Sequence, residues 1–338
     1  MLNYVYQLIS PKTISIKYQD IDVENQVIVQ PEYLAVCHAD QRYYQGKRDA
    51  KVLRKKLPMA LIHEGCGTVL YDPTHTFKVG EKVVMIPNLL SDDRAPEVYE
   101  NYRTGGGFLS SGRDGFMREF VNLTPDRLVK YENIDGRIAA ITEFVSVGMH
   151  GVERFAKLAH KYKERIGVWG DGSLAFIVSS ILKARFPEST ICVIGKNMNK
   201  LNQFSFVDET YLADDLEEDF RVDHAFECAG GEGSAYAIDN IIHYINPQGA
   251  VALMGVTETK VPINTRDILE KGLTFVGCSR SGREDFEKAV EFLKDKRIQN
   301  RLNTIIYETE PVKCLLDIHR VFSDDLNTDF KTVFKWEI

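Results

Sequence analysis

The sequence lacks several features that mark other classes of protein. No apolar run approaches the roughly 20 residues that span a bilayer, and the N-terminus has neither the basic start nor the apolar core of a signal peptide. None of the six cysteines stands in Cys-x-x-Cys spacing, so neither a disulfide framework nor a four-cysteine zinc site is expected. A net charge of −7 argues against a nucleic-acid partner. We therefore expect a cytoplasmic protein that does not cross a membrane.

Length and composition indicate an ordinary globular protein of two domains. The 338 residues are 44% hydrophobic and 27% charged, and the chain is longer than a single core usually organises. Residues 1–148 carry short β-branched runs, whereas residues 149–295 alternate between apolar strands and helical stretches. The strand-like tail, residues 296–338, is expected to rejoin the first domain. We predict an α/β protein in which a doubly wound parallel sheet accompanies a strand-rich domain.

The pattern also predicts individual elements. Strands are expected near 166–170, 190–195, 222–228, 249–255 and 273–278, with helices near 173–185, 233–244, 265–271 and 284–294. Residues 88–115 are rich in Ser, Asp and Gly and predict a long loop, which inside a domain is usually functional or mobile.

A thiol, an imidazole and carboxylates recur at a spacing that suits one metal ion. Cys37 opens a Cys-His-Ala-Asp segment that ends at Asp40, and the pair His63-Glu64 begins 26 residues after Cys37. Glu143 offers a later carboxylate. Three protein ligands and one open position are typical of catalytic zinc. We predict one zinc held by Cys37, His63 and either Glu143, which we favour, or Glu64, with Asp40 orienting His63. The alternative is a buried thiol, a core histidine and a turn aspartate.

A glycine turn after the expected strand at 166–169 predicts a dinucleotide site. Gly170 would allow the turn, and Gly172 would let the backbone approach a pyrophosphate at the start of the following helix. The next strand ends in Gly195-Lys196, where an NAD enzyme usually has an acidic residue. A missing carboxylate and an added lysine favour NADP(H). The alternative is an ordinary turn and a solvated lysine.

Further cofactor contacts are expected around the same turn and at the carboxyl ends of later strands, where ligands bind in such sheets. These candidates are Ser173, Leu174, Cys228 and Gly255.

Five segments in order resemble the zinc-containing medium-chain dehydrogenase/reductase superfamily. They are residues 37–40, 62–67, 114–121, 142–148 and 246–255. The resemblance implies a GroES-like catalytic domain over 1–148 and 296–338 and a Rossmann domain over 149–295. Three departures stand out. Ile62 replaces the usual Gly before His-Glu, residues 88–115 hold no cysteine for a structural zinc, and Ala39 stands where many relatives have a Ser or Thr proton relay.

Within that superfamily the chain is most similar to the ribitol-5-phosphate dehydrogenases of teichoic-acid and capsule synthesis. The likeness lies in residues 38–49, 57–64, 223–228 and 279–282. It implies reduction of D-ribulose 5-phosphate by NADPH to ribitol 5-phosphate, which a cytidylyltransferase converts to CDP-ribitol. That enzyme is a candidate partner, and a homodimer is expected. The alternatives are a zinc dehydrogenase of an unphosphorylated polyol or another sugar phosphate, and a non-catalytic NADP-binding structural protein.

Basic residues directly after the first metal segment suit a substrate phosphate. The candidate set is Arg42, Tyr43, Lys47 and Arg48, with Arg113 and Arg280 from elsewhere in the chain. Proton delivery is expected from a metal-bound water or from the hydroxyl of Tyr43 or Tyr44. The alternative is a solvated basic turn balanced by Asp40 and Asp49.

Overall fold

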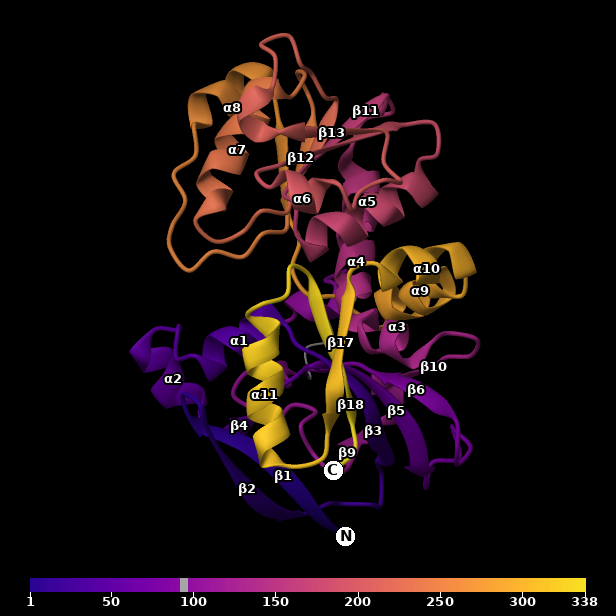
Figure 1. Ribbon diagram of the computed structural model, residues 1–338. Helices are drawn as coiled ribbons and strands as arrows, with labels where there is room; N and C mark the ends of the chain where they lie inside the picture. The colour runs from indigo at the N-terminus through magenta and orange to yellow at the C-terminus, as the bar shows by residue number, and fades with distance from the viewer. Residues whose placement is uncertain (92–96) are drawn as a thin grey trace. The chain divides into compact units, whose positions relative to one another are not determined.

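The computed structural model describes residues 1–91 and 97–338, and its contacts group them in two compact units (Figure 1). The first unit comprises Met1–Ser146 and Ser281–Ile338, and the second comprises Val147–Arg280. Residues 281–295, which the sequence pattern placed in the second domain, group with the first unit. The boundaries at 148 and 295 stay a prediction about folding domains. Residues 92–96 of the expected long loop lie outside the described residues.

The first unit is strand-rich. Its strands are β1 (Leu2–Ser10), β2 (Thr13–Asp20), β3 (Val27–Ala35), β4 (Met59–Ala60), β5 (Glu64–Tyr71), β6 (Lys82–Met85), β7 (Asn88–Leu89), β8 (Gly107–Phe108), β9 (Val121–Leu123), β10 (Leu128–Lys130), β17 (Ile306–Val312) and β18 (Lys331–Trp336). A large sheet has the order β10-β6-β5-β3-β18-β17, with β9 paired to β3, and a second has the order β2-β1-β4. Hairpin β7-β8 lies within the expected long loop.

The helices that lie wholly within the first unit are short. They are α1 (His38–Tyr44), α2 (Ala50–Lys56), α3 (Gly136–Ala140), α9 (Arg283–Leu293), α10 (Lys296–Asn303) and α11 (Leu315–Asp325), with 3₁₀ turns at Glu100–Tyr102 and Pro125–Arg127. Helix α11 packs on β17 and β18 (Figure 1). Helix α4 (Thr142–Leu158) crosses the division between the units.

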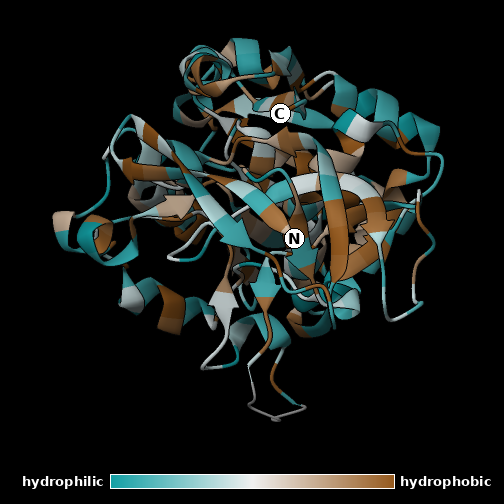
Figure 2. Ribbon diagram, turned by 90° about the horizontal axis from the view of Figure 1, so that it is seen from below, coloured by the Kyte–Doolittle hydropathy of each residue, from teal (hydrophilic) through white to brown (hydrophobic). Residues whose placement is uncertain are grey.

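The core of the first unit forms around strands that are buried along most of their length, such as β3, β6 and β18, in each of which a single residue is exposed. Figure 2 colours the ribbon by hydropathy and shows brown, hydrophobic stretches on several strands. The buried set includes Val5, Leu34, Val83, Phe116 and Phe334. Strand β18 pairs antiparallel with β3, matching Phe334 to Leu34. Strand β18 of the tail is therefore hydrogen-bonded into the sheet of the first unit.

The second unit is a six-stranded parallel sheet with the order β13-β12-β11-β14-β15-β16. Its strands are β11 (Arg165–Trp169), β12 (Thr190–Gly195), β13 (Glu209–Leu212), β14 (His224–Glu227), β15 (Ala250–Leu253) and β16 (Thr274–Gly277). Its helices are α5 (Ser173–Arg185), α6 (Met198–Leu201), α7 (Gly233–Tyr244) and α8 (Thr265–Lys271), with a 3₁₀ turn at Ala213–Asp215. The doubly wound α/β prediction is confirmed.

Strand β13 was missed because Glu209–Leu212 is a short edge segment that is only partly buried. Such a strand has no apolar run to announce it. Among the described residues, no helix is both long enough and apolar enough to cross a membrane.

Candidate functional site

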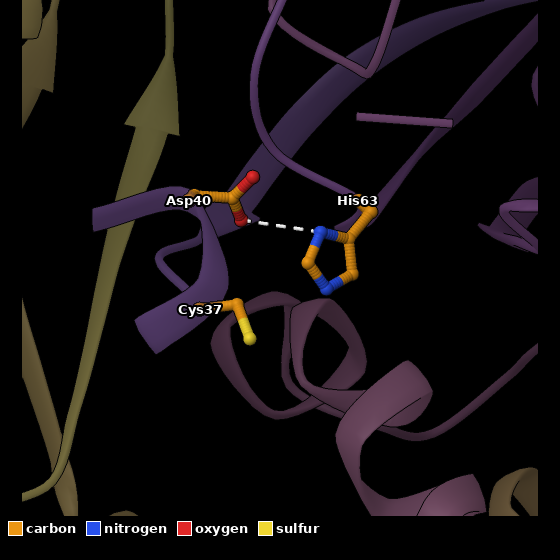
Figure 3. A group of neighbouring side chains, drawn as sticks. All are labelled: Cys37, Asp40 and His63. Atoms are coloured by element: carbon orange, nitrogen blue, oxygen red, sulfur yellow. Dashed lines mark ion pairs between the residues drawn. The ribbon is translucent and has the colours of Figure 1, made fainter. Parts of the chain in front are cut away.

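The first candidate site lies where β3 ends and β5 begins. Cys37 precedes the first turn of α1, Asp40 lies within that turn, and His63 stands directly before β5. The His63 Nδ1 atom is 3.2 Å from Asp40 Oδ2. Figure 3 shows the other ring nitrogen facing the Cys37 sulfur. One ligand atom from each of the three residues lies within 4.8 Å of the others. The structure thus brings together residues far apart in the sequence.

Asp40 is fixed by two donors besides His63. Its Oδ1 accepts from the backbone N–H of Ile62 at 3.1 Å and from the Ser110 hydroxyl. Burial opposes ionisation of Asp40, but His63 and these donors hold the pKa of its carboxyl below the usual value. Burial also opposes the charge on His63, yet Asp40 and Cys37 raise the pKa of its imidazole well above the usual value. The Asp40 carboxylate thus lies against the Nδ1 side of the His63 ring and favours the protonated imidazole.

Both donors to Asp40 come from residues in a left-handed backbone conformation. Ile62 has a φ of 69° and Ser110 a φ of 61°. A β-branched residue such as Ile rarely adopts this conformation. Ile62 is also fully buried in the core of the first unit. The replacement of the usual Gly at 62 thus leaves the ligands in place but adds local strain.

A lysine that the sequence reasoning did not select completes the surroundings of Glu64. Lys331, at the start of β18, donates from Nζ to Glu64 Oε1 at 2.6 Å and to the Val36 carbonyl at 3.0 Å. Both side chains are almost inaccessible, with exposures of 6% and 0%. Burial disfavours the Lys331 charge, but Glu64 raises its pKa above the usual value. The only sequence signal was a lysine opening an apolar strand.

Glu143 joins the cluster from the first turn of α4. One carboxylate oxygen of Glu143, one of Glu64 and one His63 nitrogen lie within 4.8 Å of one another. Burial raises the pKa of Glu143 to about 7, and the nearby Glu64 adds to this. Lys331 already donates a hydrogen bond to one oxygen of Glu64. The lysine charge therefore compensates Glu64 more than it compensates Glu143.

The chemistry of the cluster fits a divalent metal. Three buried carboxylates and a thiol face only one lysine and one imidazole. Buried atoms Asp40 Oδ2, His63 Nδ1 and Glu64 Oε2 have no hydrogen-bond partner among the described residues, although the first two form the ion-pair contact given above. A bound cation would offset the excess negative charge, which is otherwise costly to bury.

The basic residues Arg42, in the last turn of α1, and Arg48, after that helix, lie close to each other. Burial lowers the pKa of Arg42, and the charge of Arg48 lowers it further. The Arg48 guanidinium lies 4.8 Å from the centroid of the buried Tyr43 ring. Lys47 and Arg113 are exposed. Arg280 groups with the second unit.

Tyr44, one of the hydroxyls considered for proton delivery, is engaged elsewhere. Its hydroxyl is 2.7 Å from His319 Nδ1, and its ring stacks on Phe322 of α11. A role of Tyr44 in proton delivery would therefore have to include His319.

The second candidate site is the glycine turn between β11 and α5. Gly170 has a φ of 138°, and a Cβ there would lie 2.9 Å from the Cys228 carbonyl oxygen. Around Gly172 a Cβ would meet nothing within 4 Å, so the backbone is open to a ligand. Helix α5 begins at Ser173, where the sequence pattern placed the start of a helix. The turn has the openness that a phosphate group requires at a helix N-terminus.

The glycine turn brings to the end of β12 an acidic residue whose role the sequence reasoning overlooked. Asp171 accepts from the backbone N–H of Lys196 at 2.7 Å and of Asn197 at 2.8 Å. A Cβ on Gly195 would lie 2.6 Å from the Asp171 Cβ, so Gly195 is required for packing. The Lys196 ammonium lies 4.7 Å from the centroid of the Tyr236 ring.

The buried carboxylate of Glu227 lies next to Gly255 and Cys228 at the ends of β14 and β15. Glu227 accepts from the backbone N–H groups of Ala229, Gly230 and Gly255 at 3.0 to 3.1 Å. A Cβ on Gly255 would lie 2.5 Å from the Gly230 nitrogen. Burial raises the pKa of the Cys228 thiol well above the usual value. This cysteine is thus an inert, buried side chain next to the turn.

Two family models match the chain. The alcohol dehydrogenase GroES-like domain matches residues 23–133, and the zinc-binding dehydrogenase domain matches residues 199–295. The chain belongs to the zinc-binding alcohol dehydrogenases.

Individual relatives point to a smaller group within the zinc-binding alcohol dehydrogenases. The chain is 59% identical over 340 residues to the ribulose-5-phosphate reductase of Streptococcus pneumoniae, covering 100% of this chain and 98% of that protein. It is 46% identical to the ribulose-5-phosphate reductase of Bacillus spizizenii over 342 residues, covering 100% of both. The crystal structure of Staphylococcus aureus TarJ in complex with NADPH matches with a TM-score of 0.88 and 42% identity, covering 100% of both chains.

Proposed function

We propose that this protein is an NADPH-dependent zinc oxidoreductase that reduces D-ribulose 5-phosphate to D-ribitol 5-phosphate. The observation that carries the proposal is the pair of metal-ligand groups that share His63, Cys37 with Asp40 and Glu64 with Glu143, in a chain 59% identical to a ribulose-5-phosphate reductase. The product is the substrate that a cytidylyltransferase needs to make CDP-ribitol. The reaction would therefore supply precursors for teichoic acid or capsule, and we place it in the cytoplasm.

Cys37, His63 and Glu143 are the proposed zinc ligands. When bound, zinc polarises a ketone oxygen and stabilises the developing alkoxide. Asp40 keeps His63 oriented by its contact with Nδ1, which leaves the other nitrogen for the metal side (Figure 3). Lys331 donates a hydrogen bond to one oxygen of Glu64. This engagement of Glu64 favours Glu143 as the third ligand.

The second unit is proposed to bind NADPH through Gly170, Gly172, Ser173 and the strand ends at Lys196 and Gly255. Bound NADPH would supply a hydride from C4 of its nicotinamide to C2 of the ketose, and with one proton the products would be NADP⁺ and an alcohol. The open backbone at Gly172 suits a pyrophosphate. Lys196 would neutralise part of the 2′-phosphate charge.

Metal analysis combined with a substrate panel tests the proposal. The purified protein should contain one zinc per chain, and chelation should abolish NADPH oxidation with ribulose 5-phosphate. Cys37→Ala should lose both the metal and the turnover, while far-UV circular dichroism stays unchanged. Cys314→Ala is the control, because Cys314 is exposed and stands apart from the cluster.

Other outcomes would identify the competing functions. Equal turnover of free ribulose or another polyol would favour a plain polyol dehydrogenase. Metal-free protein that binds NADPH without any turnover would favour a non-catalytic binding protein. Full activity after exhaustive chelation would contradict the zinc mechanism.

A homodimer and a complex with the cytidylyltransferase are further proposals, supported by the family likeness alone. Sedimentation of the purified protein, with and without a cytidylyltransferase, measures both. A single monomeric species in each experiment would contradict them.

A further inference from the structure

The carboxylate of Glu143 lacks the direct contacts that hold the other acidic members of the metal cluster. Asp40 contacts His63, and Lys331 donates to Glu64. Within the part of the chain that the structure describes, no group donates a hydrogen bond to the Glu143 carboxylate, and no cation pairs with it. The position of this buried side chain therefore depends on the backbone that carries it, which is the first turn of α4.

Two buried serine hydroxyls hold that turn. The Ser146 hydroxyl donates to the carbonyl oxygen of Glu143 at 2.6 Å, and its Oγ lies 2.6 Å from the Oγ of Ser281. A hydroxyl has one proton, and because Ser146 gives its proton to Glu143, Ser281 is the donor between the two serines. Both residues are almost inaccessible, with exposures of 0% and 2%. Glu143 is thus linked to Ser281 through two short hydrogen bonds that are shielded from solvent.

The backbone around Ser281 is fixed by other residues of the first unit. Its carbonyl oxygen accepts a hydrogen bond from the side-chain amide of Asn88, which is 4% exposed. Two residues later, the backbone N–H of Arg283 donates to Glu100 Oε1 at 2.7 Å. The chain re-enters the first unit at Ser281, and Ser146 is the last residue before it leaves. The Ser281 hydroxyl therefore reaches Ser146 from a backbone that is held independently of α4.

We propose that Ser281 is a positioning residue for the zinc ligand Glu143 and that it acts through Ser146. The inference rests on the proposed zinc-dependent reduction, and it gives a role to one residue of the 279–282 segment. A serine in a helix often bonds back to the preceding turn by itself, but its hydroxyl can rotate. The hydrogen bond from Ser281 removes that freedom. It thereby fixes the peptide group of Glu143, whose carboxylate has no direct donor of its own.

The experiment measures the zinc dissociation constant by competition with a chromophoric chelator, which requires no turnover. Loss of a group that supports a metal ligand typically weakens metal binding by about 10- to 100-fold. Ser281→Ala should raise the zinc dissociation constant by about tenfold, because Glu143 stays present but is less well placed. Ser180→Ala is the matched control. Ser180 is also a fully buried helical serine, and its hydroxyl donates to the Phe176 carbonyl in the second unit.

The route through Glu143 is tested in the Glu143→Ala background. There Ser281→Ala should change the zinc dissociation constant by less than about twofold, because the ligand that it positions is gone. The visible absorption of the cobalt(II)-substituted protein is a second readout, since it depends on the geometry of the ligands. Ser281→Ala should alter this spectrum, whereas Ser180→Ala should leave it as in the wild type.

The outcomes distinguish this inference from the proposed function. A wild-type protein that binds no zinc would overturn both, and unchanged zinc binding in Glu143→Ala would remove Glu143 from the ligands and the inference with it. If Glu143 is a ligand but Ser281→Ala binds zinc as tightly as the wild type, Ser281 does not position it. A tenfold loss that persists in the Glu143→Ala background would show a general structural role of Ser281 and would also overturn the inference.

Discussion

Replacing Lys331 by Met should destabilise the fold, because it removes the cation that pairs with the buried Glu64 carboxylate. The Lys331 and Glu64 side chains are 6% and 0% exposed, and Nζ lies 2.6 Å from Oε1. Met keeps the length of the aliphatic stem but removes the charge. Removal of one partner of a buried ion pair usually costs about 3 to 5 kcal/mol, because the other charge stays buried without compensation. We expect a loss of this size in the free energy of unfolding.

The assay is urea unfolding at pH 7 in the presence of a chelator, so that no metal can compensate Glu64. The double variant Lys331→Met/Glu64→Gln should regain more than half of the loss, because it contains no unpaired charge. Lys335→Met is the matched control on the same strand. Lys335 is 45% exposed and pairs with Glu337, so its loss should stay within about 1 kcal/mol.

The reasoning would be refuted by a loss below about 1 kcal/mol in Lys331→Met. It would also fail if the double variant were no more stable than the single one. Either result would mean that Glu64 finds water or another donor once the lysine is gone.

Two further predictions concern the second unit. Lys196→Ala should raise the KM for NADPH roughly tenfold and leave the KM for NADH unchanged, since only NADPH has the 2′-phosphate; equal changes would contradict the assignment. His224 is buried beside His160, and burial lowers the pKa of its imidazole to about 4. Between about pH 6.5 and 4 the unfolded chain binds a proton that the folded chain does not, so stability should fall by roughly 2 to 3 kcal/mol as the pH drops. Urea unfolding should show a flatter pH profile in His224→Gln, and the exposed His243→Gln should keep the wild-type profile.

The elements that position the site could be predicted from the sequence wherever a local residue pattern determines the secondary structure. Helix α5 spans Ser173–Arg185 as expected, because a Gly-rich turn followed by an apolar run has few alternatives. The group of Cys37, His63 and Glu143 could be inferred from residue type and order. Their partners could not. Lys331 and Ser110 reach the cluster through long-range pairing and an irregular loop, and neither leaves a periodic signal. Asp171 likewise became visible only once β12 was placed beside the glycine turn.

Strain at Ile62 should reverse the usual order of alanine and glycine variants. A left-handed backbone costs a non-glycine residue about 1 to 2 kcal/mol, and Ile62 has a φ of 69°. Ile62→Ala and Ile62→Gly both leave a cavity, but only the glycine variant releases the strain. We therefore expect Ile62→Gly to be more stable than Ile62→Ala by about 1 kcal/mol in urea unfolding. Leu61 is the control, because it is equally buried and has no positive φ, so there the alanine variant should be the more stable of the two. If alanine were the better residue at both positions, the left-handed conformation would not be strained. The left-handed backbone that directs the Ile62 N–H to Asp40 would then need another explanation.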